Sequence, residues 1–114
     1  MNPGLLRHPF RLERKVTGQD EAGRAEPVWL PVVETMAAIQ PLRGSEYFLA
    51  EREGSDTTHK VTIRAVPGVR VQPHEHRVVV TDPAGERVFE VQSALDLEER
   101  GAWLTLMCRE EAAA

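Results

Sequence analysis

One stretch, residues 41–69, constrains the fold of this 114-residue chain more than any other. From Thr58 to Ala65 apolar and polar residues alternate. Because successive side chains of a β-strand point to opposite faces, the alternation predicts a strand with one face exposed to water. The sequence Val-Pro-Gly-Val at 66–69 is typical of a type II turn, since proline presets the first central φ and glycine accepts the positive φ that follows. We therefore expect the chain to reverse direction there.

A short helix is predicted just before this strand. Ser45 is a suitable N-cap, and Glu46 lies close to the positive end of the helix dipole. We expect a helix over about residues 46–53, which the Gly-Ser-Asp sequence at 54–56 ends. A helix of this length is not stable by itself, so it is either held by neighbours or mobile. Residues 41–57 are thus predicted to form a helix and loop insertion between two strands.

The rest of the chain indicates β-structure. Strands are predicted over residues 10–16, 28–39, 76–81, 87–94 and 102–109, in addition to 58–65. Residues 17–27 are expected to be a solvated loop, and Pro31 to mark an edge, a bulge or the early part of its strand. Asp-Pro-Ala-Gly at 82–85 predicts a hairpin loop. Six short strands and one short helix, with no βαβ rhythm, predict a mainly-β fold, a small six-stranded barrel or sandwich.

Composition predicts one globular domain over residues 1–114, without transmembrane or signal segments. Hydrophobic residues make up 41% of the chain and charged residues 28%, which is typical of globular proteins. Aromatic residues make up only 5%, so the core is expected to consist mainly of Val, Leu and Ile. A platform that stacks single-stranded nucleic acid is not indicated.

The charge distribution argues against a protein that grips phosphates. The formal net charge is −4, from 14 basic and 18 acidic residues. Residues 1–44 carry six basic and five acidic side chains, which leaves eight basic and thirteen acidic ones for the remainder. An acidic wall repels the DNA backbone, so DNA would slide along it rather than bind.

No catalytic or cofactor-binding motif is present. His74 and His76 are the best metal candidates, because residues i and i+2 of a strand face the same side, but the third protein ligand is missing. This pair supports the runner-up hypothesis, a small β-barrel enzyme or metal-dependent binding module. Cys108 shares a strand face with Leu104 and Leu106, so it is expected to be a buried core residue. The acidic run at 96–99 lacks the spacing of a calcium loop.

The order and spacing of residues along nearly the whole chain resemble a known family. The pattern includes Leu6-Arg7-His8 before the first strand, then Pro41, Gly44, Glu46 and Ala50, then Thr58-His59 leading into Arg64 and Pro67-Gly68. The sequences VFEV at 88–91 and LTLMCRE at 104–110 complete it. This pattern resembles the head-tail joining proteins of tailed bacteriophages, also called head-closure or stopper proteins.

The resemblance implies a structural virion protein at the neck between head and tail, assembled in the bacterial cytoplasm. It implies a small β-barrel that forms a homo-oligomeric ring, a hexamer or dodecamer, on the portal and adaptor proteins. Tail terminator or tail tube proteins would bind its other side, and packaged DNA would pass without sequence-specific binding. Enzymatic activity, cofactors, metals and membrane contact are not expected. The resemblance covers phages, prophage remnants and gene transfer agents alike, and another neck ring such as a tail terminator is a further alternative.

The resemblance also assigns a role to the segment after the second strand, about residues 43–57. In this family the segment can reach into the lumen of the ring and help to retain packaged DNA. Here the apolar run at 47–49 offers more apolar surface than one face of a short helix can bury. We therefore expect the segment to face the channel or a neighbouring subunit; the alternative is a helix that packs across the mouth of its own barrel. The candidate contact residues are Arg43, Glu46, Tyr47, Phe48, Leu49, Glu51, Arg52, Glu53 and Asp56.

Overall fold

The computed structural model describes residues 6–44, 49, 52, 56–96 and 101–111. Six β-strands make up the fold: β1 (His8–Gln19), β2 (Ala25–Pro41), β3 (His59–Arg64), β4 (His76–Asp82), β5 (Gly85–Leu95) and β6 (Trp103–Glu110). Each lies where the sequence predicts a strand. Of the predicted helix over 46–53, the structure describes only Leu49 and Arg52, both helical. Its other residues lie outside the described part. No helix in the described part is long and apolar enough to span a membrane.

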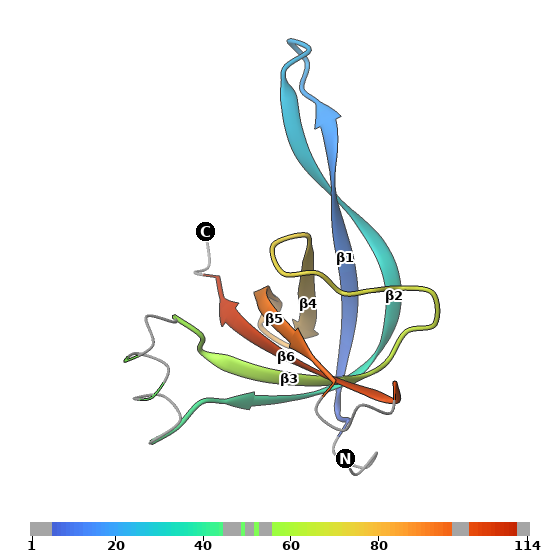
Figure 1. The fold of residues 1–114 in the computed structure, drawn as a ribbon. Coiled ribbons are helices and arrows are strands. Elements are labelled where there is room, and N and C mark those ends of the chain that lie inside the picture. The colour runs from blue at the N-terminus through green and yellow to red at the C-terminus, as the bar shows by residue number, and fades with distance from the viewer. Residues whose placement is uncertain (1–5, 45–48, 50–51, 53–55, 97–100, 112–114) are drawn as a thin grey trace.

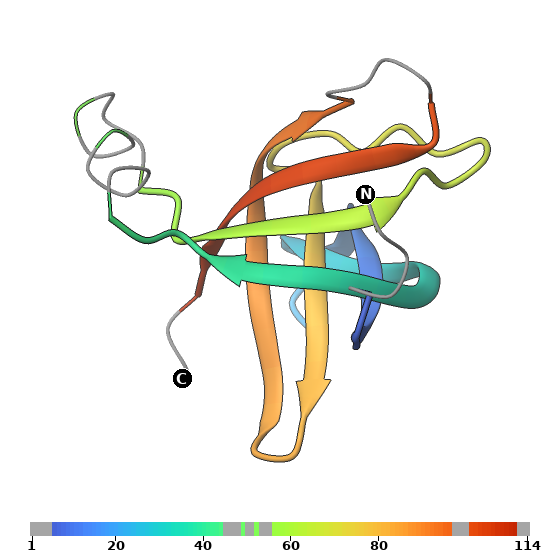
Figure 2. The same ribbon diagram turned by 90° about the horizontal axis from the view of Figure 1, so that it is seen from below.

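The strands form one closed antiparallel barrel in the order β1-β2-β3-β6-β5-β4 (Figures 1 and 2). β1 closes it, because Phe10 to Arg14 pair with β4 on one side while the whole strand pairs with β2 on the other. Between the alternatives that the sequence left open, the structure thus selects the barrel. Closure pairs the strand edges that an open sheet would leave exposed.

The barrel interior is filled by the apolar face of every strand. On β3, Val61 and Ile63 are fully buried, as the alternation predicted, and they lie opposite Leu106 and Leu104 of β6. Cys108 is the next inward residue of β6 and is also fully buried. The buried core consists of Phe10, Leu12, Ala37, Val61, Ile63, Val71, Val78, Val80, Phe89, Val91, Leu106 and Cys108. Aliphatic side chains dominate this core, as the low aromatic content predicted.

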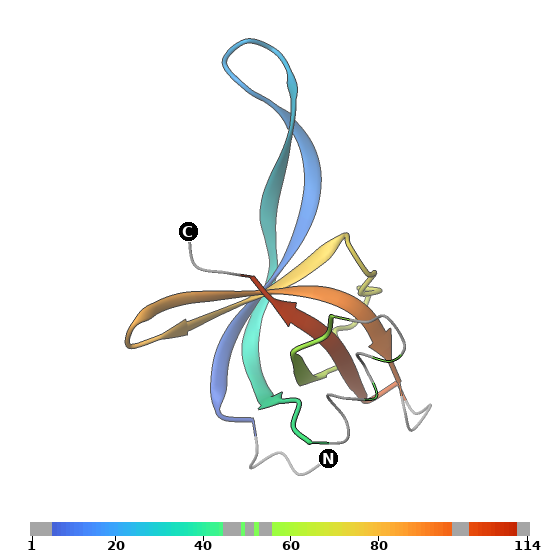
Figure 3. The same ribbon diagram turned by 90° about the vertical axis from the view of Figure 1, so that its left-hand side faces the viewer.

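The first two strands continue well beyond the barrel as a two-stranded ribbon (Figure 3). The prediction of a loop over residues 17–27 is therefore wrong, because β1 runs to Gln19 and β2 begins at Ala25. Polar composition suggested a loop, but a ribbon exposed on both faces tolerates the same composition. Asp20 closes the turn, since its Oδ1 accepts hydrogen bonds from the backbone N–H groups of Ala22 (2.9 Å) and Arg24 (2.8 Å).

The ribbon leaves the barrel at a β-bulge beside Pro31. Leu12 pairs with Val33 and Glu13 pairs with Pro31, so Val32 is the extra residue of β2. This confirms the bulge as the meaning of Pro31, which has no N–H to donate to a ladder. A bulge bends its strand and increases the local twist, which directs the ribbon away from the barrel.

An ion-pair cluster on the outside of the barrel, centred on the buried Glu13, stabilises the place where the ribbon leaves the barrel. Glu13 is only 5% exposed, and its carboxylate accepts hydrogen bonds from Nε of Arg77 and Nε of Arg11, both at 2.7 Å. Glu13 and Arg77 face each other across the β1–β4 ladder that closes the barrel. The Arg77 guanidinium lies over the Trp29 ring of the ribbon, 4.4 Å from its centroid. The cluster therefore links barrel closure to the base of the ribbon.

The two predicted turns form as expected. Val69 N donates to Val66 O over 3.1 Å, and Gly68 has φ +77°. In the β4–β5 hairpin, Ala84 N donates to Asp82 Oδ1 over 2.8 Å, and Gly85 has φ +129°. A β-carbon at Gly68 would meet no atom within 4 Å, so only its backbone conformation requires glycine.

Gly68→Ala should therefore destabilise the protein through conformational strain alone. We expect a loss of about 1 kcal/mol, because the left-handed penalty of ~1–2 kcal/mol exceeds the entropy gain of ~0.4–1 kcal/mol from a less flexible unfolded chain. Gly68→Asn is the matched variant and should lose less, since asparagine tolerates this region. Urea unfolding measures both, and a stabilising alanine would show that the left-handed turn is absent.

Glu13→Gln should weaken the barrel and change its acid sensitivity. Burial raises the pKa of Glu13, but the hydrogen bonds from Arg77 and Arg11 outweigh this and lower it below its ordinary value. A depressed carboxylate pKa stabilises the fold above the unfolded pKa of about 4.3, and this contribution is lost as pH falls through the folded pKa. At pH 7 we expect a loss of about 2–3 kcal/mol, since both arginines keep some access to water.

The pH dependence of the unfolding free energy at acid pH distinguishes an ionic role of this cluster from a local packing effect. Between pH 5 and pH 3, the unfolding free energy of Glu13→Gln should fall less steeply than that of the wild type. Glu86→Gln is the control, because Glu86 contacts Arg11 at 3.6 Å with its side chain 54% exposed. It should change stability by less than about 0.5 kcal/mol. Parallel pH profiles for wild type and Glu13→Gln would contradict the assignment.

Candidate functional site

The segment between β2 and β3 begins and ends at adjoining points on one end of the barrel. Leu42 N donates to Thr58 O over 2.9 Å, and Thr58 N donates to Cys108 O over 2.9 Å. The antiparallel ladder of β2, β3 and β6 thus continues one residue past the strands. Both roots of the segment are held by the barrel backbone (Figure 1).

Side chains of β5 and β6 hold the returning root. The Asp56 carboxylate accepts hydrogen bonds from Arg109 Nη1 (2.8 Å) and from the side-chain amide of Gln92. Thr57, which is 5% exposed, donates from Oγ1 to Gln92 Oε1 over 2.6 Å. Gln92 lies at the register shift between Val91 and Ser93. A bulge re-aims the side chain of its extra residue, and here that side chain points to the root.

The polar contacts continue from this root across the barrel surface. Arg109 also contacts the carboxylate of Glu90, which lies directly opposite it on β5. The other Glu90 oxygen lies 3.1 Å from Nδ1 of His74. The hydrogen bond from Gln92 is the main cause that lowers the pKa of Asp56, with Arg109 adding to it. Because these side chains all keep access to water, the contacts orient the root more than they stabilise the fold.

A second cluster lies beneath the same root. Thr58 Oγ1 accepts the backbone N–H of Glu110 at 2.8 Å, and the His59 ring packs edge-on against Phe89 at 5.0 Å between centroids. Burial lowers the pKa of His59, so the neutral ring is favoured at neutral pH. Arg87 Nε donates to Glu110 Oε1 over 2.8 Å, and this bond is the main cause that lowers the pKa of Glu110.

The described candidate residues lie on the outside of the barrel. Arg43 lines an open depression of about 410 Å³ with the end of β2 and Lys60. Leu49 is 55% exposed, and Arg52 and Asp56 are also exposed. Among the candidates in the described part of the chain, Asp56 is the one that side-chain hydrogen bonds connect to the barrel. Glu46, Tyr47, Phe48, Glu51 and Glu53 lie outside the described residues.

The two histidines do not share a strand face as the sequence analysis assumed. His74 lies in the turn before β4, with φ +65° and its side chain 69% exposed. His76 begins β4, is 4% exposed, and accepts the backbone N–H of Gln72 at Nδ1 over 3.0 Å. The alternation rule holds only within a strand, and His74 precedes it. No group of three His, Cys, Asp or Glu side chains in the described ranges is placed to hold a metal ion.

Cys108 has the properties of a core residue, as predicted. It is fully buried, and burial raises its pKa to about 12. A thiol with this pKa is almost entirely protonated at neutral pH and is a poor nucleophile.

In the acidic run at 96–99, Asp96 Oδ2 accepts the backbone N–H of Gly101 at 2.7 Å, while Glu98 and Glu99 lie outside the described residues.

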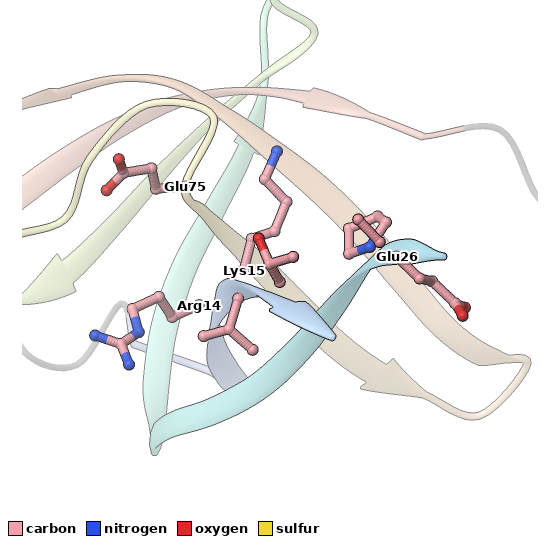
Figure 4. Close-up of a pocket in the computed structure, with 8 residues that line it drawn as sticks. Arg14, Lys15, Glu26 and Glu75 are labelled. Carbon is pink, nitrogen blue, oxygen red and sulfur yellow. The ribbon is translucent and has the colours of Figure 1, made fainter. Parts of the chain in front are cut away.

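Two open clefts flank the ribbon, and sequence analysis missed both. One, of about 470 Å³, is lined by both ribbon strands and Glu75. Figure 4 shows that Arg14 and Lys15 extend to different sides of β1, while Glu26 points away from both. The second, of about 430 Å³, lies between the ribbon base and the loop that contains Gly68 and Arg70. The exposed apolar residues Val28 and Leu30, beside two prolines, are the sequence signal that could have identified this surface.

Comparisons with known proteins place this geometry in a family. The family model described as phage head completion protein matches residues 1–111. No curated protein matches the chain. A solved structure titled as the virion of a native gene transfer agent particle contains a similar chain, with 28% identity, TM-score 0.62 and coverage of 96% of this chain and 97% of that one.

The solution structure of a Shigella flexneri 2a protein has the same fold, with TM-score 0.68 and 22% identity over 100% of both chains. The resemblance that the sequence carried is thus confirmed by the match over nearly the whole chain. The chain belongs to the phage head completion protein family, and it is a structural virion component rather than an enzyme.

Proposed function

We propose that this protein is a neck component that joins the DNA-filled head to the tail and helps to close the DNA channel. In this proposal it forms a ring on the portal and adaptor proteins and presents a surface to tail terminator or tail tube proteins. The family match over residues 1–111 supports the general role in the virion. The specific position at the neck is the proposal.

The observation that supports the channel role is that segment 43–57 is hydrogen-bonded to the barrel at both of its ends. Leu42 and Thr58 hydrogen-bond to each other at the barrel end, and Asp56 is held by Arg109 and Gln92. None of the segment's described residues belongs to the buried hydrophobic core. A segment that is fixed at both ends, and whose described residues lie outside the core, is suited to project from a ring without weakening each subunit.

Charge is consistent with a channel that DNA traverses. The chain has a formal net charge of −4, and the segment carries more acidic than basic side chains. In the proposed mechanism, the segments of neighbouring subunits obstruct DNA sterically. Tight binding of phosphates would hinder the ejection of DNA, and electrostatic repulsion prevents such binding.

Replacing residues 45–55 with a Gly-Ser linker of equal length tests the channel role. The anchors at Asp56 and Thr57 are kept, so the barrel should remain folded by circular dichroism and retain its unfolding midpoint. Particles carrying this variant should lose packaged DNA or fail to join tails, measured by nuclease-protected DNA and electron microscopy. If the isolated domain unfolds, the segment belongs to the core and the assignment is wrong.

A variant that lacks three of the segment's acidic side chains separates steric from electrostatic closure. Glu46, Glu51 and Glu53 are changed together to Gln, which keeps the segment's size. If closure is steric, these particles should retain DNA while the linker variant does not. Equal DNA loss from both would contradict steric closure.

Ring assembly is expected to depend on partners, since complementary surfaces must be repeated around a closed ring. Native mass spectrometry should detect ring-sized complexes when the protein is mixed with its portal and adaptor assembly. The protein alone should be smaller. A monomer that is unchanged in the mixture would count against the neck role.

A further inference from the structure

The cleft at the base of the ribbon has the chemistry of a peptide-binding site. Its apolar lining consists of Leu30, Pro31 and Val32 on β2 and the loop residues Gly68 and Val69, and Arg14 and Arg70 also line it. Both walls are supported by the barrel, because Val32 and Val69 pack against its core. The cleft is thus formed in the single subunit and does not require a partner to create it.

Apolar surface continues from this cleft along the ribbon. Leu30 is 46% exposed and Val28 is 38% exposed, and both lie on one face because they are two residues apart in β2. Val16 pairs with Val28 on the same face. A β-carbon at Gly18 would lie 2.5 Å from Cγ2 of Val28, so glycine makes room for the Val28 side chain there. Clustered exposed apolar side chains of this kind mark interaction surfaces.

The charges around the cleft favour a carboxylate in the occupant. Within the described part of the chain, neither Arg14 nor Arg70 has an ion-pair partner. Glu75 also lines the cleft, so the three charged side chains sum to one positive charge. Arg77, by contrast, is fully engaged by Glu13 and Trp29. Two arginines that have no ion-pair partner among the described residues, beside an apolar cleft, can form charge-assisted hydrogen bonds with an Asp or Glu.

Other occupants fit less well. DNA phosphates would meet Glu75 and the apolar side chains of the walls, which contribute nothing to phosphate binding. In the ribbon, β2 pairs with β1 on one side only, so its other edge is free in the described part of the chain. Pro27 and Pro31 discourage the addition of a strand along this edge, because proline cannot donate to a ladder and protects sheet edges. Recognition therefore depends on side chains rather than on backbone pairing.

We infer that this cleft docks an extended segment of another virion protein, in which an apolar side chain contacts Leu30 and a neighbouring Asp or Glu binds Arg14 and Arg70. The inference rests on the proposed function only in placing the partner in the same particle. It assigns the ribbon base, on a different element from segment 43–57, to attachment rather than to channel closure (Figure 1).

Photo-crosslinking in assembled particles tests which molecule lies in the cleft. A benzophenone amino acid replaces Leu30, and a second variant carries it at Leu95, which is 43% exposed and does not line the cleft. After irradiation, peptide mapping should place the Leu30 adduct on a different virion protein, within two or three residues of an Asp or Glu. An adduct to a second copy of this chain or to DNA, or none, would overturn the inference.

The peptide identified in this way then serves as the probe for binding to the purified protein. Arg14→Gln and Arg70→Gln should each weaken its affinity roughly five- to tenfold, and Glu75→Gln should strengthen it, because that change removes a repelling carboxylate. Circular dichroism confirms that each variant is folded. Affinity that is unchanged in all three would contradict the role of charge and overturn the inference.

Incorporation of the unmodified protein into particles separates this inference from the proposed function. If quantitative mass spectrometry finds the protein in tailed particles but the Leu30 variant gives no adduct to a partner protein, only the inference fails. If the protein is absent from the particles, the proposed function fails as well.

Discussion

The pairing of β1 with both β2 and β4 is the constraint on which the rest of this structure depends. The residues from Phe10 to Arg14 have partners on both sides, and this converts a six-stranded sheet into a closed barrel. Closure gives each inward side chain neighbours on all sides, which is why Leu12, Val78 and Phe89 are fully buried. Glu13 and its two arginines lie on the outside of the same ladder, so an ionic cluster accompanies the closing contact.

Strand length then determines what the barrel presents to other molecules. β1 has 12 residues and β2 has 17, more than the barrel wall needs, so the excess forms the ribbon. The bulge at Val32 sets its direction, and the Arg77–Trp29 contact supports its base. At another point of the barrel, the bulge at Gln92 directs that side chain to Asp56 and Thr57. Two irregularities in otherwise regular ladders thus set the direction of the ribbon and of the side chain that holds Asp56 and Thr57.

The ribbon base and the described residues of segment 43–57 have different physical properties, which supports proposing different roles for them. Segment 43–57 has polar, exposed contacts at its returning root, and the described candidate residues lie outside the barrel core. The ribbon base has an apolar cleft with two arginines that lack ion-pair partners in the described residues. We propose that the first arrangement serves to obstruct a channel and the second to hold a partner. In a structural virion protein, function consists of such contacts.

Sequence alone determined the strand positions, both turns and the aliphatic core, because these depend on local alternation and on the φ preferences of proline and glycine. The alternation in β3 correctly placed Val61 and Ile63 inside, and the order of residues along the chain correctly indicated the family. Only the tertiary structure decided between barrel and sandwich, extended the first hairpin through residues 17–27, and separated His74 from His76. It also brought Asp56 to Arg109 and Glu13 to Arg77. The physical reason is that strand register and closure join residues distant in the chain, and no local pattern encodes which edges will pair.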